Sequence, residues 1–242
     1  GDQMNAYIMK PKDFDPNKKY PLFMFQYSGP GSQQVSNSWD GGNGLWFNHL
    51  VQKGYIVVCV DGRGTGYRGT KYKKVTYKNL GKYEIEDQIA AAKWLGNQSY
   101  IDKSRIGIFG WSYGGYMASL AMTKGADVFK AGIAVAPVTN WRYYDSIYTE
   151  RFLQTPQENP EGYDQNSPTT FAKLLKGKFL LIHGTADDNV HFQNSMEFSE
   201  ALIQNNKQFE FMAYPDKNHG IYGGQTRPQK KKKMTDFILE NL

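Results

Sequence analysis

Residues 105–123 read Arg105-Ile-Gly-Ile-Phe-Gly-Trp-Ser-Tyr-Gly-Gly-Tyr-Met-Ala-Ser-Leu-Ala-Met-Thr123. The apolar start predicts a short strand and the run from Tyr116 predicts a helix, with Gly110-Trp-Ser-Tyr-Gly114 between them. This order is the setting that a G-x-S-x-G nucleophile elbow requires. Such a tight turn strains the serine backbone and exposes its hydroxyl, while the glycines let the flanking backbones approach closely. We therefore interpret Ser112 as a nucleophile.

Short apolar runs alternate with helical patterns on both sides of this turn. We expect helices at 45–53, 83–95, 116–123, 194–204 and 232–240, and strands at 5–9, 20–27, 55–60, 105–109, 131–136, 178–183 and 209–214. The first two strands, with a polar turn between them, look like a hairpin. This alternation predicts one α/β domain over residues 1–242: a mostly parallel, twisted central sheet with helices on both faces and an antiparallel N-terminal start. Together with the elbow it indicates an α/β-hydrolase fold.

Composition excludes several other classes of protein. The 242 residues suit one large domain, and 40% hydrophobic residues suit a packed core. The net charge of +6 is scattered except for the run 230–233, which we interpret as a solvated helix start or loop, so no nucleic-acid partner is expected. No apolar stretch is long enough to span a membrane. The chain opens at Gly1 and is strand-like almost at once, which suggests a fragment of a longer protein.

Neither a cofactor nor a metal is expected. Cys59 is the only cysteine and lies in an apolar run, which predicts a buried, inert thiol and excludes an internal disulfide. Gly62-Arg-Gly-Thr-Gly66 follows a predicted strand, but no helix begins at that loop, as a dinucleotide site would require. We interpret it as a structural loop.

A serine nucleophile needs a base, and the chain has four histidines. In α/β-hydrolases the order is serine, acid, histidine. His219 fits this order because it follows the last predicted strand. His49 precedes the serine, His183 ends a strand and looks like a hydrogen-bonded structural residue, and His191 lies too close to the acidic loop.

The acid is expected after the strand that precedes the base. Asp187 and Asp188 both follow the strand at 178–183, and their spacing does not separate them. The acid holds the imidazole tautomer and stabilises the imidazolium. The backbone N–H of Tyr113, directly after the nucleophile, is the expected first donor to an oxyanion.

Several segments resemble the catalytic domain of the prolyl oligopeptidase family of serine peptidases, most closely its dipeptidyl peptidase IV branch. They are Gly110-Trp-Ser-Tyr-Gly-Gly-Tyr116, Asp61-Gly-Arg-Gly-Thr-Gly66, Ala134-Val-Ala-Pro-Val138, Trp141 with Tyr143-Tyr-Asp145, Tyr148-Thr-Glu-Arg151 and His183-Gly-Thr-Ala-Asp-Asp-Asn-Val-His-Phe192. The resemblance runs over essentially the whole chain.

By position, the resemblance implies that Ser112 is the nucleophile, Asp187 the acid and His219 the base. It implies that the Tyr27 hydroxyl is the second oxyanion donor, beside the N–H of Tyr113. It also implies a flat apolar pocket for a proline ring, and a residue, Asn189, that holds the substrate carbonyl. The pocket residues are Tyr113, Val138, Trp141, Tyr144, Tyr148 and Val190.

The resemblance implies a serine exopeptidase that releases N-terminal dipeptides with proline or alanine second. Its expected partners are the peptide substrate, an N-terminal β-propeller of the same protein and a second copy in a homodimer. Its expected location is periplasmic, at the cell surface or secreted. Two alternatives stay open: an acylaminoacyl peptidase, oligopeptidase or esterase with the same triad, and a non-catalytic interaction module.

Overall fold

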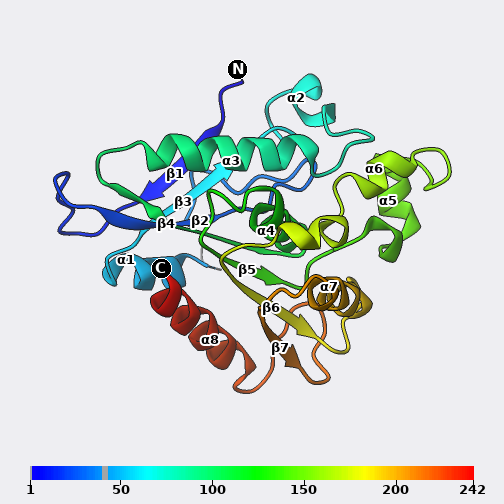
Figure 1. Ribbon diagram of the computed structural model, residues 1–242. Helices are drawn as coiled ribbons and strands as arrows, with labels where there is room; N and C mark the ends of the chain where they lie inside the picture. Colours follow the sequence, from blue (N-terminus) through cyan, green and yellow to red (C-terminus); the bar gives the residue numbers. More distant parts are fainter. Residues whose placement is uncertain (1, 40–42) are drawn as a thin grey trace.

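The computed structural model describes residues 2–39 and 43–242, and these residues form a seven-stranded sheet in the order β1-β3-β2-β4-β5-β6-β7 (Figure 1). β1 runs antiparallel to β3, and all other neighbours are parallel. The predicted α/β-hydrolase fold is confirmed. The strands are β1 (Asn5–Met9), β2 (Tyr20–Phe25), β3 (Ile56–Asp61), β4 (Ile101–Trp111), β5 (Ala131–Val135), β6 (Lys178–Gly184) and β7 (Glu210–Tyr214).

The predicted hairpin between the first two strands is wrong. β3 lies between them, with Asn5 opposite Asp61 on one side and Leu22 opposite Ile56 on the other. β2 is buried along its whole length, so it needs a neighbour on each side and takes β3 and β4. β1 is largely exposed, as an edge strand can be.

The helices predicted from the sequence are all present, and α8 begins earlier than expected. The short helices α2, α5 and α6 were not predicted. The helices are α1 (Gly44–Gln52), α2 (Thr70–Lys74), α3 (Lys82–Gly96), α4 (Tyr113–Lys124), α5 (Ser146–Leu153), α6 (Pro160–Asp164), α7 (Gln193–Gln204) and α8 (Thr226–Asn241), with 3₁₀ turns η1 (Trp141–Tyr143) and η2 (Pro168–Leu174).

Two apolar cores cover the two faces of the sheet. Leu22 and Met24 of β2 pack into the core shared with α3, α4 and α7, whereas Phe23 and Phe25 pack into the core shared with α1 and α8. This two-residue alternation is what a strand buried on both faces requires. Figure 1 shows α3 on one side of the sheet and α1 with α8 on the other.

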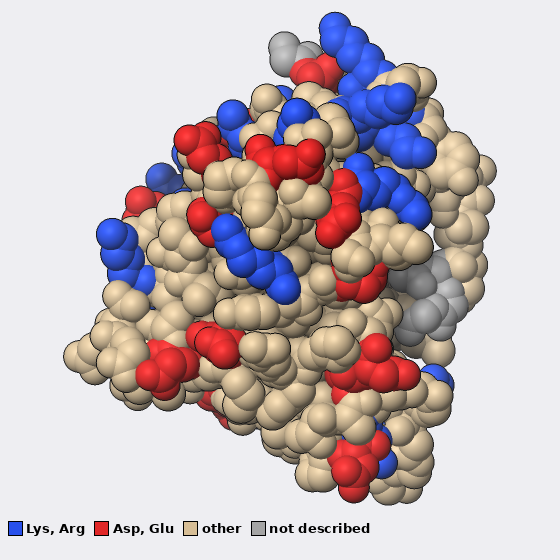
Figure 2. All heavy atoms as spheres, turned by 90° about the vertical axis from the view of Figure 1, so that its right-hand side faces the viewer, with Lys and Arg blue, Asp and Glu red and all other residues tan. Residues whose placement is uncertain are grey.

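All parallel strands end at the same edge of the sheet. Tyr27 follows β2, Ser112 follows β4, Asp187 follows β6 and His219 follows β7. Ligands of α/β sheets bind at this carboxyl edge. Figure 2 views the molecule from this side and shows most of the Lys and Arg on its upper part.

The lysine run is not a solvated helix start throughout. It lies inside α8, and Lys230 is only 3% exposed. Lys232 pairs with Asp236 at 2.6 Å and Lys233 with Glu210 at 2.5 Å. Lys232 and Lys233 therefore form ion pairs within the domain.

Cys59 is buried, as predicted, in the core on the α1 and α8 side. Within residues 2–39 and 43–242, no helix combines the length and the apolar character that crossing a membrane would take.

Candidate active site

Ser112 occupies a sharp turn between β4 and α4. Its φ of 59° lies in the left-handed region, and its N–H donates to the Val135 carbonyl at 2.8 Å. The flanking glycines are needed for space: a Cβ on Gly110 would lie 2.1 Å from the Gly114 oxygen, and one on Gly114 would lie 2.6 Å from the Gln26 oxygen. The strain of the serine is thus enforced by close backbone contacts.

Two potential donors lie beside this serine. Tyr113 is the first residue of α4, so its N–H has no acceptor within the helix. The Tyr27 hydroxyl lies close enough to the Ser112 side chain for the serine to lower the pKa of the phenol. Burial raises the pKa of Tyr27 and outweighs the opposite effect of Ser112, so the phenol keeps its proton at neutral pH and can donate it.

His219 and Asp187 form a hydrogen-bonded pair. The Nδ1 atom of His219 lies 2.8 Å from Oδ2 of Asp187, whose side chain is fully buried. Because a carboxylate accepts, Nδ1 carries the proton, and Nε2 keeps its lone pair. This is the tautomer that a general base needs.

Asp187 is also held by three further donors. His183 Nε2 donates at 3.0 Å, and the backbone N–H groups of Asn189 and Val190 donate at 2.9 and 3.0 Å. Burial alone would raise the pKa of Asp187, but the hydrogen bonds from His183, His219 and Asn189 hold it well below its usual range. The carboxyl is therefore an anion at neutral pH. Asp188 is exposed, so the structure separates the two candidates that spacing did not.

His183 is a buried supporting residue. Its Nδ1 lies 2.7 Å from the Ser195 hydroxyl, and its Nε2 also lies 2.9 Å from the Val190 carbonyl. Both ring nitrogens are thus satisfied, as expected of a structural histidine. His49 lies on α1, and His191 is exposed beyond the acidic loop.

Trp111 connects the elbow to the loop that carries His219. Its indole Nε1 donates to the His219 carbonyl at 3.1 Å. In the part of the chain that the structure describes, no hydrogen bond joins Ser112 to His219 directly. Trp111 instead links the loop that carries His219 to the end of the strand that precedes Ser112.

An aromatic cluster lies next to the elbow. Trp141 stacks on Tyr148 with ring centroids 5.9 Å apart and contacts Tyr113 at 5.5 Å and Tyr144 at 5.8 Å. Trp141 and Tyr113 are buried, whereas Tyr144 and Tyr148 are partly exposed. The exposed part of the cluster is therefore a pair of tyrosine rings over a buried indole.

The other predicted pocket residues lie in the same region. Val138 and Val190 are buried in the core that contains Trp141 and Tyr113. Asn189 is exposed, and its side-chain oxygen accepts from the Tyr144 hydroxyl at 2.8 Å.

Glu84 is a neighbour of the site that the sequence analysis missed. It is fully buried on α3, accepts from the Tyr113 hydroxyl at 2.7 Å and accepts from the N–H of Gly81 at 3.0 Å. Burial raises its pKa to about 7. The only sequence signal was an acidic residue near the start of an otherwise amphipathic helix.

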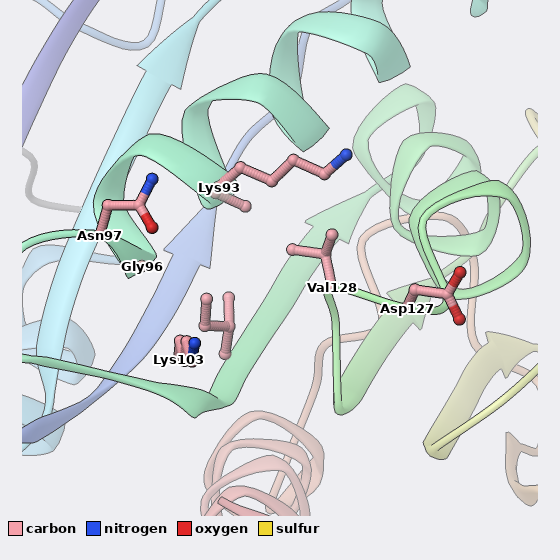
Figure 3. A pocket seen from close by; sticks show the side chains of 8 residues that line it. Lys93, Gly96, Asn97, Lys103, Asp127 and Val128 are labelled. Carbon is pink, nitrogen blue, oxygen red and sulfur yellow. The ribbon is translucent and has the colours of Figure 1, made fainter.

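Among the described residues, no group of three or more histidine, cysteine, aspartate or glutamate side chains is placed to hold a metal ion. A cavity of about 330 Å³ lies between the end of α3 and the start of β4, lined by Lys93, Asn97, Lys103 and Asp127 (Figure 3). It lies at the amino ends of the strands, opposite Ser112, and so is separate from the site.

Comparisons with known proteins show the family to which this chain is similar. The pattern of the Prolyl oligopeptidase family matches residues 45–242. The chain is 46% identical to the Probable dipeptidyl-aminopeptidase B of Neurospora crassa over 99% of its own length and 26% of the relative's. It is 45% identical to the Prolyl endopeptidase FAP of Mus musculus over 96% of its own length and 31% of the relative's.

A solved structure has the same fold. The crystal structure of Porphyromonas gingivalis dipeptidyl peptidase 4 superposes with a TM-score of 0.95 at 53% identity, covering 99% of this chain and 34% of that one. The chain thus spans about a quarter to a third of the length of these proteins.

Proposed function

The chain belongs to the prolyl oligopeptidase family, and from that premise we propose that it is the catalytic domain of a serine exopeptidase that releases N-terminal dipeptides with proline or alanine second. One observation carries the proposal: a strained serine at a helix N-terminus lies beside a histidine–aspartate pair and an aromatic cluster at one edge of the sheet.

The chemistry follows from the atoms in place. Ser112 Oγ attacks the carbonyl carbon of the second residue while His219 Nε2 takes the hydroxyl proton. Asp187, an anion bonded to Nδ1, stabilises the imidazolium that forms. The Tyr113 N–H and the Tyr27 hydroxyl donate to the oxyanion.

Collapse of the tetrahedral intermediate breaks the peptide bond. His219 gives its proton to the leaving amine, and the dipeptide stays on Ser112 as an ester. A water molecule, deprotonated by His219, then attacks that ester and releases the dipeptide. A hydrogen bond between the Ser112 hydroxyl and Nε2 of His219 is expected to form when substrate binds, because catalytic hydrogen bonds are often long without substrate and tighten in the complex.

The aromatic cluster supports proline as the residue before the cleaved bond. A proline ring has no amide N–H to satisfy, so ring faces rather than hydrogen-bond partners suit it. Tyr144 and Tyr148 would contact the ring, with Trp141 behind them, and Val138, Val190 and the Tyr113 ring would close the pocket. The side-chain oxygen of Asn189 accepts from the Tyr144 hydroxyl, so the amide nitrogen of Asn189 would donate to a substrate carbonyl.

The greater length of the matched relatives supports a further domain in the whole protein. We propose that this domain is a β-propeller, that it binds the free amine of the substrate, and that the protein forms a homodimer. That domain, and not residues 1–242, would then recognise the free N-terminus of the substrate and limit the length of the released peptide.

Two substrates and one variant test the proposal. The full-length protein should release the dipeptide from Ala-Pro-p-nitroanilide and leave the acetylated substrate intact, and Ser112→Ala should abolish release. Cleavage of the acetylated substrate would favour an acylaminoacyl peptidase or an endopeptidase. Intact mass after reaction with a fluorophosphonate should show one adduct on the wild type and none on Ser112→Ala. An adduct that persists on Ser112→Ala would overturn the assignment of the nucleophile.

A further inference from the structure

Lys230 is an unusual residue in the outer layer of this fold. It lies on α8, yet only 3% of it is exposed. Burial, and then repulsion from Lys231 and Arg227, lower the pKa of Lys230 to about 7. A buried ammonium normally requires a carboxylate partner. The partners of Lys230 in the described part of the chain are neutral: two carbonyl oxygens and an indole ring.

These neutral partners belong to the active site. Lys230 Nζ lies 2.9 Å from the Ile221 carbonyl oxygen and 3.4 Å from that of Gly220, the two residues that follow His219. The same nitrogen lies 3.9 Å from the ring centroid of Trp111, the residue before the nucleophile. One ammonium thus contacts both the elbow and the loop that carries the base.

Lys230 and Trp111 together donate hydrogen bonds to three successive carbonyl oxygens. The His219 carbonyl accepts from Trp111, and those of Gly220 and Ile221 accept from Lys230. Ile221 is fully buried with a φ of 45°, a conformation that strains a β-branched residue. Such strain persists only where the surroundings enforce it, and Lys230 is one of the groups that do so.

The start of α8 also holds the other end of this loop. Tyr214 ends β7, directly before the loop, and its hydroxyl donates to the side-chain oxygen of Gln229. Gln229 and Lys230 are consecutive residues of α8. Residues 215–221 are therefore fixed at both ends by one turn of one helix.

We propose that Lys230 is a positioning residue for the reaction: its side chain fixes the backbone after His219 against Trp111 and so keeps the imidazole within reach of Ser112. The inference rests on the proposed function for its catalytic consequence. Its structural part, the immobilised loop, is independent of any activity.

The test compares three variants of the full-length protein. Lys230→Met removes the charge and the donors but keeps an unbranched chain, Lys230→Arg keeps both, and Lys232→Met changes an exposed lysine of the same helix. We expect Lys230→Met to lower kcat and the rate of fluorophosphonate labelling at least tenfold, with KM changed less than threefold. Its Tm should not fall, because removal of a buried ammonium without a carboxylate offsets the lost contacts.

Lys230→Arg should recover part of the lost kcat, and Lys232→Met should match the wild type. Amide hydrogen exchange at residues 219–222 should be faster in Lys230→Met than in the wild type, and this readout needs no catalysis. Exchange and labelling rates equal to those of the wild type would overturn the proposal, and so would an Arg variant no more active than the Met variant. If the wild type itself is not labelled, the proposed function fails, and hydrogen exchange alone then decides whether Lys230 holds the loop.

Discussion

Ser112 and His219 are held in place by different means. The serine is fixed by backbone: its own N–H bonds to Val135, and close contacts at Gly110 and Gly114 leave no room for a side chain. The histidine lies on a loop and is fixed by side chains from elsewhere: Asp187 after β6, Trp111 at the end of β4 and Lys230 on α8.

This difference predicts different sensitivities. Single side-chain changes away from the elbow should leave Ser112, the proposed nucleophile, in position, because its geometry is set by the strand, the turn and the helix that surround it. His219, the proposed base, depends on a few side-chain contacts, so losing any one of them should reduce the rate. The variants below test that contrast.

The largest effect is expected at Asp187. Asp187→Asn keeps the size of the side chain but no longer enforces the proton on Nδ1 of His219, so kcat should fall by about 10⁴-fold. Asp188→Asn, an exposed neighbour, is the matched control and should stay within about twofold, the scatter expected of a surface change. Steady-state kinetics on a dipeptide substrate measure both. Equal losses in the two variants would contradict the assignment of the acid.

A smaller loss is expected for Tyr27→Phe. It removes one of two donors to the oxyanion, which should lower kcat by about 10²- to 10³-fold with little change in KM. Fluorophosphonate labelling should slow in parallel, since the adduct also develops charge on an oxygen. A Phe variant with unchanged kcat would show that the Tyr113 N–H suffices.

Glu84, which lies under Tyr113 next to the elbow, should make the free energy of unfolding depend on pH. Its pKa is 4.5 in the unfolded chain and about 7 when folded, so the folded state binds more protons between these values. Stability from this group is greatest at low pH and falls as pH rises from 4.5 to about 7.

Glu84→Gln should remove this decline in the free energy of unfolding, which is on the order of 3 kcal/mol at most. Urea unfolding at pH 5 and pH 8 measures it, with exposed Glu197→Gln as the control. If the backbone fixes Ser112, the labelling rate of the Gln variant should stay within threefold of the wild type. A large loss of labelling would mean that Tyr113 and its carboxyl partner also position the elbow.

The smallest effect is expected for Trp111→Phe. It removes the N–H that holds the His219 carbonyl but keeps an aromatic ring under Lys230. A hydrogen bond of about 1 kcal/mol corresponds to about a fivefold loss of kcat. Trp94→Phe, at an exposed indole, should change nothing. A loss no greater than that of Trp94→Phe would show that this contact does not position the base.

The strands, the main helices and the elbow could be predicted because each rests on a local pattern. Two-residue alternation and helical periodicity come from side-chain directions along the backbone. The pairing of β1 could not be predicted, since the alternative neighbours β2 and β3 are both apolar strands, and only the burial of β2 between β3 and β4 excludes a hairpin.

The sequence by itself determined the Gly110–Gly114 turn, the order of serine, acid and base, and the run of aromatic residues from Trp141 to Tyr148. The tertiary structure decided which aspartate bonds to His219, which face of the lysine run is buried, and that Glu84 lies under Tyr113. The physical reason is range. The glycines that a tight turn requires can be recognised within five residues of sequence, whereas a buried charge finds its partners among residues that only the folded chain brings together.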